Sequence, residues 1–143
     1  MDRSAELIAF SGQFRSVLRS INQEWNKRMT HNLSYTQFKM MFRLHLEGKL
    51  KVSELAESMG LTSGAITGVA DKLVAEDYVM RERATDDRRV VYIEITPKGK
   101  LMIEELLDSQ RETILSLFTR LPDEDIQHLK RIFAQLIANI EKL

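Results

Sequence analysis

Hydroxyl-bearing and small residues are concentrated between positions 62 and 72 of the sequence, shortly after Gly60. Such a group at the start of a helix could bind an anion, because hydroxyls hydrogen-bond to phosphates or base edges and the helix dipole favours negative charge there. A lysine further along could neutralise a phosphate, although a threonine at a helix start is most often just an N-cap. The residues are Thr62, Ser63, Gly64, Thr67 and Lys72.

A second group of side chains, between positions 81 and 89, carries concentrated positive charge. Its four arginines are Arg81, Arg83, Arg88 and Arg89. They could neutralise DNA phosphates or enter a groove, but each alone could equally be a charged strand edge that deters aggregation. Asp86 and Asp87 cancel part of this charge, so we expect them to brace an arginine rather than to contact DNA.

Residues for covalent or metal chemistry are scarce. The absence of cysteine excludes disulfides, thiolate-bound zinc and a cysteine nucleophile. The three histidines, His31, His45 and His128, lack metal-ligand spacing such as His-x3-His. The sequence also contains no nucleophile elbow, phosphate-binding glycine loop or paired catalytic carboxylates. We therefore expect no enzymatic activity, no metal and no other cofactor.

The 143 residues have a net charge of zero, but the charge is unevenly distributed. Residues 1–51 hold nine Lys and Arg against four Asp and Glu, whereas residues 101–143 hold five against eight. A DNA-binding surface must therefore be assembled locally. No apolar stretch approaches the roughly 20 residues of a membrane span, and no secretory signal opens the chain. We expect a cytoplasmic protein without a membrane partner.

Apolar periodicity predicts the helices that would position these groups. A long helix is expected over residues 4–29, and Ser34 with Gln37 has the capping-box spacing of a second one that ends at Gly48. Two short helices over 53–76, separated only by Gly60 and Leu61, are typical of a helix-turn-helix. Thr96 and Pro97 mark the start of a helix, and the two helical stretches within 97–143 are separated near position 122.

A change from helical to strand periodicity predicts a β-hairpin over residues 79–96 with a charged tip. A hairpin that follows a helix-turn-helix is a winged helix. The expected fold is mainly α, a single domain over 1–143, with a winged helix-turn-helix core at 30–100. The flanking helices, 4–29 and 97–143, carry more apolar surface than one chain needs, which predicts a dimerisation region. The alternative is an intramolecular helix pair.

Several motifs in this order resemble the MarR family of bacterial transcription regulators. They are Leu33-Ser34…Gln37-Phe38, Val52-Ser53-Glu54-Leu55-Ala56…Gly60-Leu61-Thr62, Val69…Asp71-Lys72-Leu73, Val79…Arg81-Glu82-Arg83…Asp87-Arg88-Arg89 and Ile95-Thr96-Pro97-Lys98-Gly99. The resemblance covers roughly residues 30–105, and the wing with Thr-Pro-Lys-Gly is its most specific part.

The resemblance implies a homodimer that binds a pseudo-palindromic operator on double-stranded DNA, with one winged helix per subunit. By position, Asp87 would shape the wing, and Arg89, together with Arg88, would enter the minor groove. Most family members are repressors that a small phenolic or lipophilic ligand releases from DNA. One departure is Gly68, because relatives commonly carry an arginine there. A glycine within a helix costs roughly 0.5–1 kcal/mol relative to alanine.

Aromatic residues and histidines between positions 25 and 45 could line a cavity for such a ligand, where the dimerisation helices meet the winged helix. These residues are Trp25, His31, Phe38, Phe42 and His45, with Met29 and Met41 beside them. The alternative is that they form an ordinary core. A second alternative concerns the function: a winged helix with two long helices could be a protein-interaction scaffold without specific DNA binding.

Overall fold

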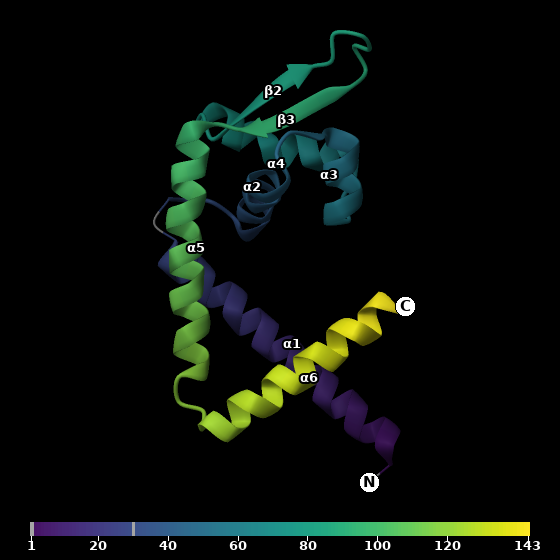
Figure 1. The fold of residues 1–143 in the computed structure, drawn as a ribbon, viewed down its shortest axis with the longest axis vertical. Coiled ribbons are helices and arrows are strands. Elements are labelled where there is room, and N and C mark those ends of the chain that lie inside the picture. Colours follow the sequence, from purple (N-terminus) through teal and green to yellow (C-terminus); the bar gives the residue numbers. More distant parts are fainter. Residues whose placement is uncertain (1, 30) are drawn as a thin grey trace. The chain divides into compact units, whose positions relative to one another are not determined.

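The computed structural model describes residues 2–29 and 31–143, which separate into two compact units, 1–110 and 111–143. The boundary lies within a long helix. Figure 1 shows the ribbon coloured along the sequence, with the six helices of the described residues and strands β2 and β3 labelled. In chain order, the elements are α1 (Arg3–Arg28), α2 (Tyr35–Glu47), β1 (Leu50–Lys51), α3 (Val52–Met59), α4 (Ser63–Ala75), β2 (Val79–Arg83), β3 (Val91–Ile95), α5 (Pro97–Phe118) and α6 (Asp123–Glu141).

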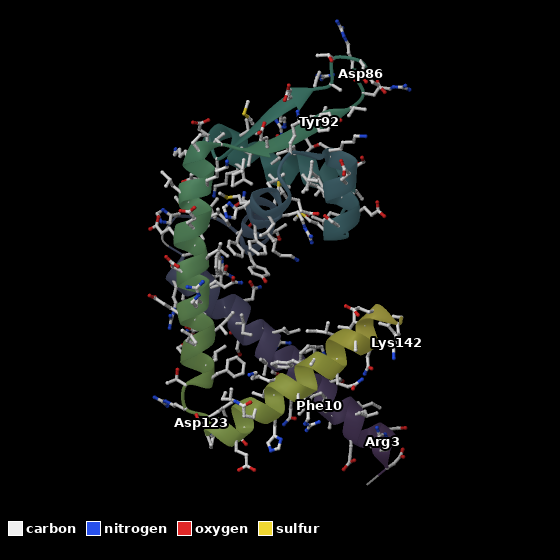
Figure 2. The ribbon with its side chains drawn as sticks, viewed as in Figure 1. Arg3, Phe10, Asp86, Tyr92, Asp123 and Lys142 are labelled. Atoms are coloured by element: carbon white, nitrogen blue, oxygen red, sulfur yellow. The ribbon has the colours of Figure 1, made fainter. Side chains whose placement is uncertain are left out.

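The winged helix-turn-helix is present with the predicted bounds. Helices α3 and α4 together occupy 52–75, and strands β2 and β3 occupy 79–95, each within one residue of the prediction. Strands β2 and β3 pair antiparallel, with Val79 opposite Ile95 and Arg83 opposite Val91. The hairpin projects beyond α3 and α4 (Figure 1), and Asp86 lies at its tip (Figure 2).

Local capping signals explain where the helices begin. Ser34 and Gln37 form the predicted capping box, with a Ser34 N to Gln37 Oε1 distance of 2.8 Å and a Gln37 N to Ser34 Oγ distance of 3.1 Å. The hydroxyl of Thr62 accepts a hydrogen bond from Ala65 N (3.1 Å), and that of Thr96 accepts one from Gly99 N (3.0 Å). These bonds satisfy backbone donors that a helix start otherwise leaves unpaired.

Two glycines end helices in different ways. Gly60 lies in the left-handed region (φ 67°, ψ 32°), which residues with a side chain rarely adopt, and it turns the chain from α3 toward α4. Gly48 also has a positive φ (79°), but its ψ is −155°. The chain therefore leaves α2 in an extended direction, without a left-handed cap, and enters β1.

Strand β1 has only two residues and is absent from the sequence-based prediction. Leu50 pairs antiparallel with Ile93 and Lys51 with Tyr92, which gives a three-stranded sheet of order β1-β3-β2. Helix α3 follows at once, one residue before the predicted start. The carboxylate of Glu54 accepts a hydrogen bond from Lys51 N (3.0 Å), so Glu54 satisfies a free donor at this helix start.

An apolar core joins α2, α3, α4, the sheet and the first half of α5. Its fully buried side chains include Met40, Met41, Leu44, Leu55, Ile66, Leu73, Ile93 and Ile103. By contrast, the apolar stripe of α1 is largely exposed, with Leu7, Phe14 and Leu18 at least half exposed. Helix α6 has an apolar stripe too, and none of its residues is buried.

Candidate nucleic-acid interface

Helix α4 is anchored to the core along one face and exposed along the other. Ile66, Ala70 and Leu73 are buried in the core, together with Ala56 of α3. The exposed residues of the first three turns are Ser63, Gly64, Ala65, Thr67, Gly68 and Asp71. The predicted hydroxyl and glycine positions therefore lie on the outward face.

The hydroxyl groups on α4 are partly committed to the helix itself. Thr62 caps the helix through Ala65 N, which is the ordinary structural role of a threonine at this position. Thr67 Oγ1 donates to the carbonyl of Ser63 at 3.1 Å. Ser63 is exposed at the helix N-terminus, where the dipole favours an anion.

The wing is held in shape by its own charged groups. The carboxylate of Asp87 accepts hydrogen bonds from the backbone N of Arg89 (3.0 Å) and from its Nε (3.3 Å). Arg83 Nη1 donates to the carbonyl of Arg88 (3.0 Å), across the base of the tip. This arrangement is the brace expected of Asp87. Asp87 engages only the Nε atom of Arg89, and the Arg89 side chain remains 92% exposed, so its two Nη atoms can still bind a partner.

Arg81 joins the wing to α4. Its Nη2 atom donates to the carbonyl of Thr67 (3.1 Å) and forms an ion pair with the carboxylate of Asp71. The two contacts fix the wing relative to the exposed face of α4. Arg81 therefore has a positioning role, and its charge is largely matched by Asp71.

A hollow of about 530 Å³ lies between the wing and the starts of α3 and α4. It collects four cations and three hydroxyl groups from segments that are distant in the sequence. Its lining consists of Lys51, Val52, Ser53, Ser63, Thr67, Arg81, Arg83, Arg89, Val90 and Val91. Such a combination of positive charge and hydroxyl donors suits a phosphate backbone.

Two polar lining residues, Lys51 and Ser53, were not predicted from the sequence. Lys51 belongs to β1, whose pairing with Tyr92 bridges about 40 residues of chain, and Ser53 is in the first turn of α3. The only local signal for them was the motif Val52-Ser53-Glu54, which indicates a helix start and not a shared surface. The pairing of β1 with β3 explains why both lie beside the wing.

Lys72 does not join this surface. Its ammonium donates to the backbone carbonyl of Asn32, and it lines a separate hollow of about 490 Å³. The other residues of that hollow are Asn26, Met29, Leu33, Ser34 and Gln37, with Asn32 itself. The phosphate contact predicted for Lys72 does not fit this geometry, because position 72 lies on the side of α4 that faces the loop between α1 and α2.

Three of the five candidate ligand residues, Trp25, Phe38 and Phe42, form a packed aromatic cluster. Trp25 and Phe38 are buried with ring centroids 4.6 Å apart, and Phe42 stacks on Phe38 at 6.1 Å. His31 Nε2 lies 3.3 Å from Glu105 Oε1, and His45 is half-buried. None of these five residues lines the hollow beside Lys72; only Met29, from the wider set, does. The close packing of Trp25, Phe38 and Phe42 favours the interpretation that these rings form an ordinary core.

The described part of the chain contains neither a metal-binding cluster nor a helix suited to a bilayer. Within residues 2–29 and 31–143, no group of three or more His, Cys, Asp or Glu side chains is arranged to hold a metal ion. Over the same residues, no helix combines the length and apolar character needed to cross a membrane.

Comparisons with known proteins agree with this architecture. The family model described as MarR family matches residues 33–91. The HTH-type transcriptional regulator MhqR from Bacillus subtilis is 30% identical, over 76% of this chain and 76% of its own. The HTH-type transcriptional repressor YetL, also from B. subtilis, is 28% identical over 95% of this chain and 83% of its own. A mutant of MarR from E. coli, solved in complex with operator DNA, has the same fold, with a TM-score of 0.77. It is 20% identical, and the match covers 95% of this chain and 99% of the MarR chain.

Proposed function

The chain belongs to the MarR family of transcriptional regulators, and we propose that it binds a palindromic operator on double-stranded DNA as a homodimer. On this proposal α4 enters the major groove and the wing reaches the adjacent minor groove or the backbone. Members of this family are regulators and not enzymes, in line with the lack of catalytic motifs in the sequence.

The observation that carries the proposal is the cation-lined hollow between α4 and the wing. Lys51, Arg83 and Arg89 bring positive charge from three segments to one concave surface. Ser63 adds a hydroxyl at the helix start, beside the same charges. A DNA duplex with its major groove over α4 would bring a phosphate backbone across this hollow. There the cations could form charge-assisted hydrogen bonds with the phosphates, which are stronger than hydrogen bonds between neutral groups.

The exposed apolar side chains on the flanking helices support dimerisation. On α1 they include Leu7, Ile8, Phe10, Phe14, Val17 and Leu18. On α6 they include Ile132, Phe133, Leu136, Ile137 and Ile140. Exposed apolar stripes of this length are typical of a subunit interface. A two-fold dimer presents two winged helices, so we expect two half-sites about one helical turn apart.

We further propose that the protein represses transcription in the cytoplasm and that a small phenolic or lipophilic ligand releases it from DNA. Repression is supported by the relative YetL, which is described as a repressor. For a phenolic ligand, the hollow at Lys72, Asn26 and Gln37 is a better candidate than the packed aromatic cluster, because its polar side chains could hydrogen-bond to a phenolic hydroxyl.

Replacing Arg89 with alanine tests the role of the wing directly. We expect operator binding to weaken by at least ~1 kcal/mol, about fivefold, as for other specific groove contacts. The backbone bond from residue 89 to Asp87 survives this change, so the wing keeps its shape. The dissociation constant is measured by fluorescence anisotropy on an operator selected from a random DNA pool.

Arg43→Ala is the matched control for this experiment. Arg43 is an arginine of α2 that pairs with Glu47 (3.2 Å) and does not line the cation-lined hollow. We expect Arg43→Ala to bind like the unchanged protein. Equal affinities for the Arg89 variant and the control would contradict the assignment of the wing to DNA.

Replacing Lys72 with alanine should leave the salt dependence of DNA binding unchanged. Its ammonium is engaged by the Asn32 carbonyl and lies in the other hollow, so the change removes no phosphate-binding group. The measurement is the slope of log affinity against log salt concentration, which becomes shallower by about one for each phosphate that the protein no longer binds. A shallower slope for this variant would show that Lys72 binds a DNA phosphate after all.

A further inference from the structure

The outermost positions of α4 carry no side chain. Gly64 and Gly68 are four residues apart, on the face opposite the buried residues Ile66 and Ala70. A Cβ atom at Gly68 would meet nothing within 4 Å, and one at Gly64 only the Thr62 hydroxyl at 3.9 Å. The fold itself therefore does not require either glycine, and two glycines weaken a helix. The presence of two glycines on this face is explained if another molecule approaches the helix backbone closely there.

The groups that flank the two glycines are methyl groups. Ala65 is exposed on one side, and Thr67 is exposed on the other. Because the Thr67 hydroxyl donates to the Ser63 carbonyl, the methyl group is the part of this side chain left for contacts. Asp71 follows on the same face, but Arg81 holds its carboxylate.

Helix α4 lacks the side chains that recognise purines in the major groove. Guanine is typically read by arginine or lysine and adenine by asparagine or glutamine, each through two hydrogen bonds. Residues 63–75 contain no arginine, asparagine or glutamine, and their one lysine, Lys72, is bound to Asn32. The positive charges nearby come from β1 and the wing instead.

We propose that α4 recognises the C5-methyl groups of thymine, with Thr67 as the specificity-determining residue. The inference rests on the proposed function, because it assumes that α4 enters the major groove. Alanine and threonine methyl groups contact the thymine methyl, the one apolar feature of the groove edge. The two glycines let the helix approach the bases closely enough for this contact, while Lys51, Arg83 and Arg89 bind the phosphate backbone of the DNA.

The test replaces thymine by deoxyuridine, one position at a time, in an operator selected from a random DNA pool. Uracil pairs as thymine does but lacks the methyl group. We expect one or two positions per half-site to bind about fourfold more weakly after replacement, the factor for exposing one buried methyl group.

Two variants identify the protein side of this contact. Thr67→Ser keeps the hydroxyl and deletes the methyl, so it should bind thymine and uracil operators equally. Thr67→Val keeps a methyl and deletes the hydroxyl, so it should still prefer thymine. Thr36→Ser, which removes an exposed methyl from α2, is the matched control and should keep the full preference.

The outcomes separate the inference from the function on which it rests. A preference for thymine that disappears in Thr67→Ser but persists in Thr67→Val supports the proposal. If no uracil replacement changes the affinity while salt-dependent binding persists, the inference is overturned and the proposed function stands. If no sequence from the pool is retained at low salt, both are overturned.

Discussion

Replacing Gly99 with alanine is expected to lower the free energy of unfolding by about 3 kcal/mol, at the upper end of the usual cost of overpacking a core. Gly99 is buried in the first turn of α5. A Cβ atom there would stand 2.1 Å from the backbone carbonyl O of Tyr78 and 2.7 Å from Ile95 Cγ1. That carbonyl already accepts the hydrogen bond of Thr96 N (3.0 Å), so it cannot move without breaking the junction between β3 and α5.

The measurement is urea unfolding at one fixed protein concentration, since dimerisation would make stability depend on concentration. Gly68→Ala is the matched control, because a Cβ atom at Gly68 meets nothing within 4 Å. We expect this variant to gain roughly 0.5–1 kcal/mol from improved helix propensity. Equal stability of the two variants would contradict the close approach of α5 to Tyr78.

Raising the salt concentration from about 50 to about 200 mM is expected to weaken operator binding roughly 10³-fold. The reason is that cations of the protein displace counterions from DNA phosphates, and higher salt opposes their release. Lys51, Arg83 and Arg89 line the hollow in each subunit, while Arg81 is matched by Asp71. A dimer would thus make about six phosphate contacts and give a log–log slope of about −5.

The slope also provides an internal control. Arg89→Ala removes one cation from each subunit, so the slope should become shallower by about two in the dimer. Arg43→Ala should leave it unchanged, because Arg43 pairs with Glu47 on α2. A flat salt profile for the unchanged protein would contradict a phosphate-binding role for the hollow and would favour the protein-interaction alternative.

Features governed by neighbouring residues could be predicted from the sequence. The capping box of Ser34 and Gln37, the tight turn at Gly60 and the cap of Thr96 each act over three or four residues. Apolar periodicity then placed the helices, because each must bury one face. The bracing of Arg89 by Asp87 is also local, since the two residues are two positions apart in the hairpin tip.

Features that depend on distant segments could not be predicted in this way. Strand β1 exists because Leu50 meets Ile93, and two residues carry no periodicity of their own. The helical wheel places Lys72 near the outward side of α4. In the structure, however, its ammonium donates a hydrogen bond to the carbonyl of Asn32, 40 residues earlier in the chain. The close packing of Trp25 against Phe38 likewise joins two different helices, so the sequence alone left open whether these rings form a core or line a ligand site.

The order of the elements, the winged helix-turn-helix and the arginine-bearing wing follow from the sequence alone, because caps, turns and periodicity act between residues close along the chain. Which charges share a surface follows only from the packing of the folded chain. Lys51 lies beside Arg83 and Arg89, Arg81 pairs with Asp71, and Lys72 lies in a different hollow. Contacts between distant segments depend on how the sheet and the helices pack, which no local spacing specifies.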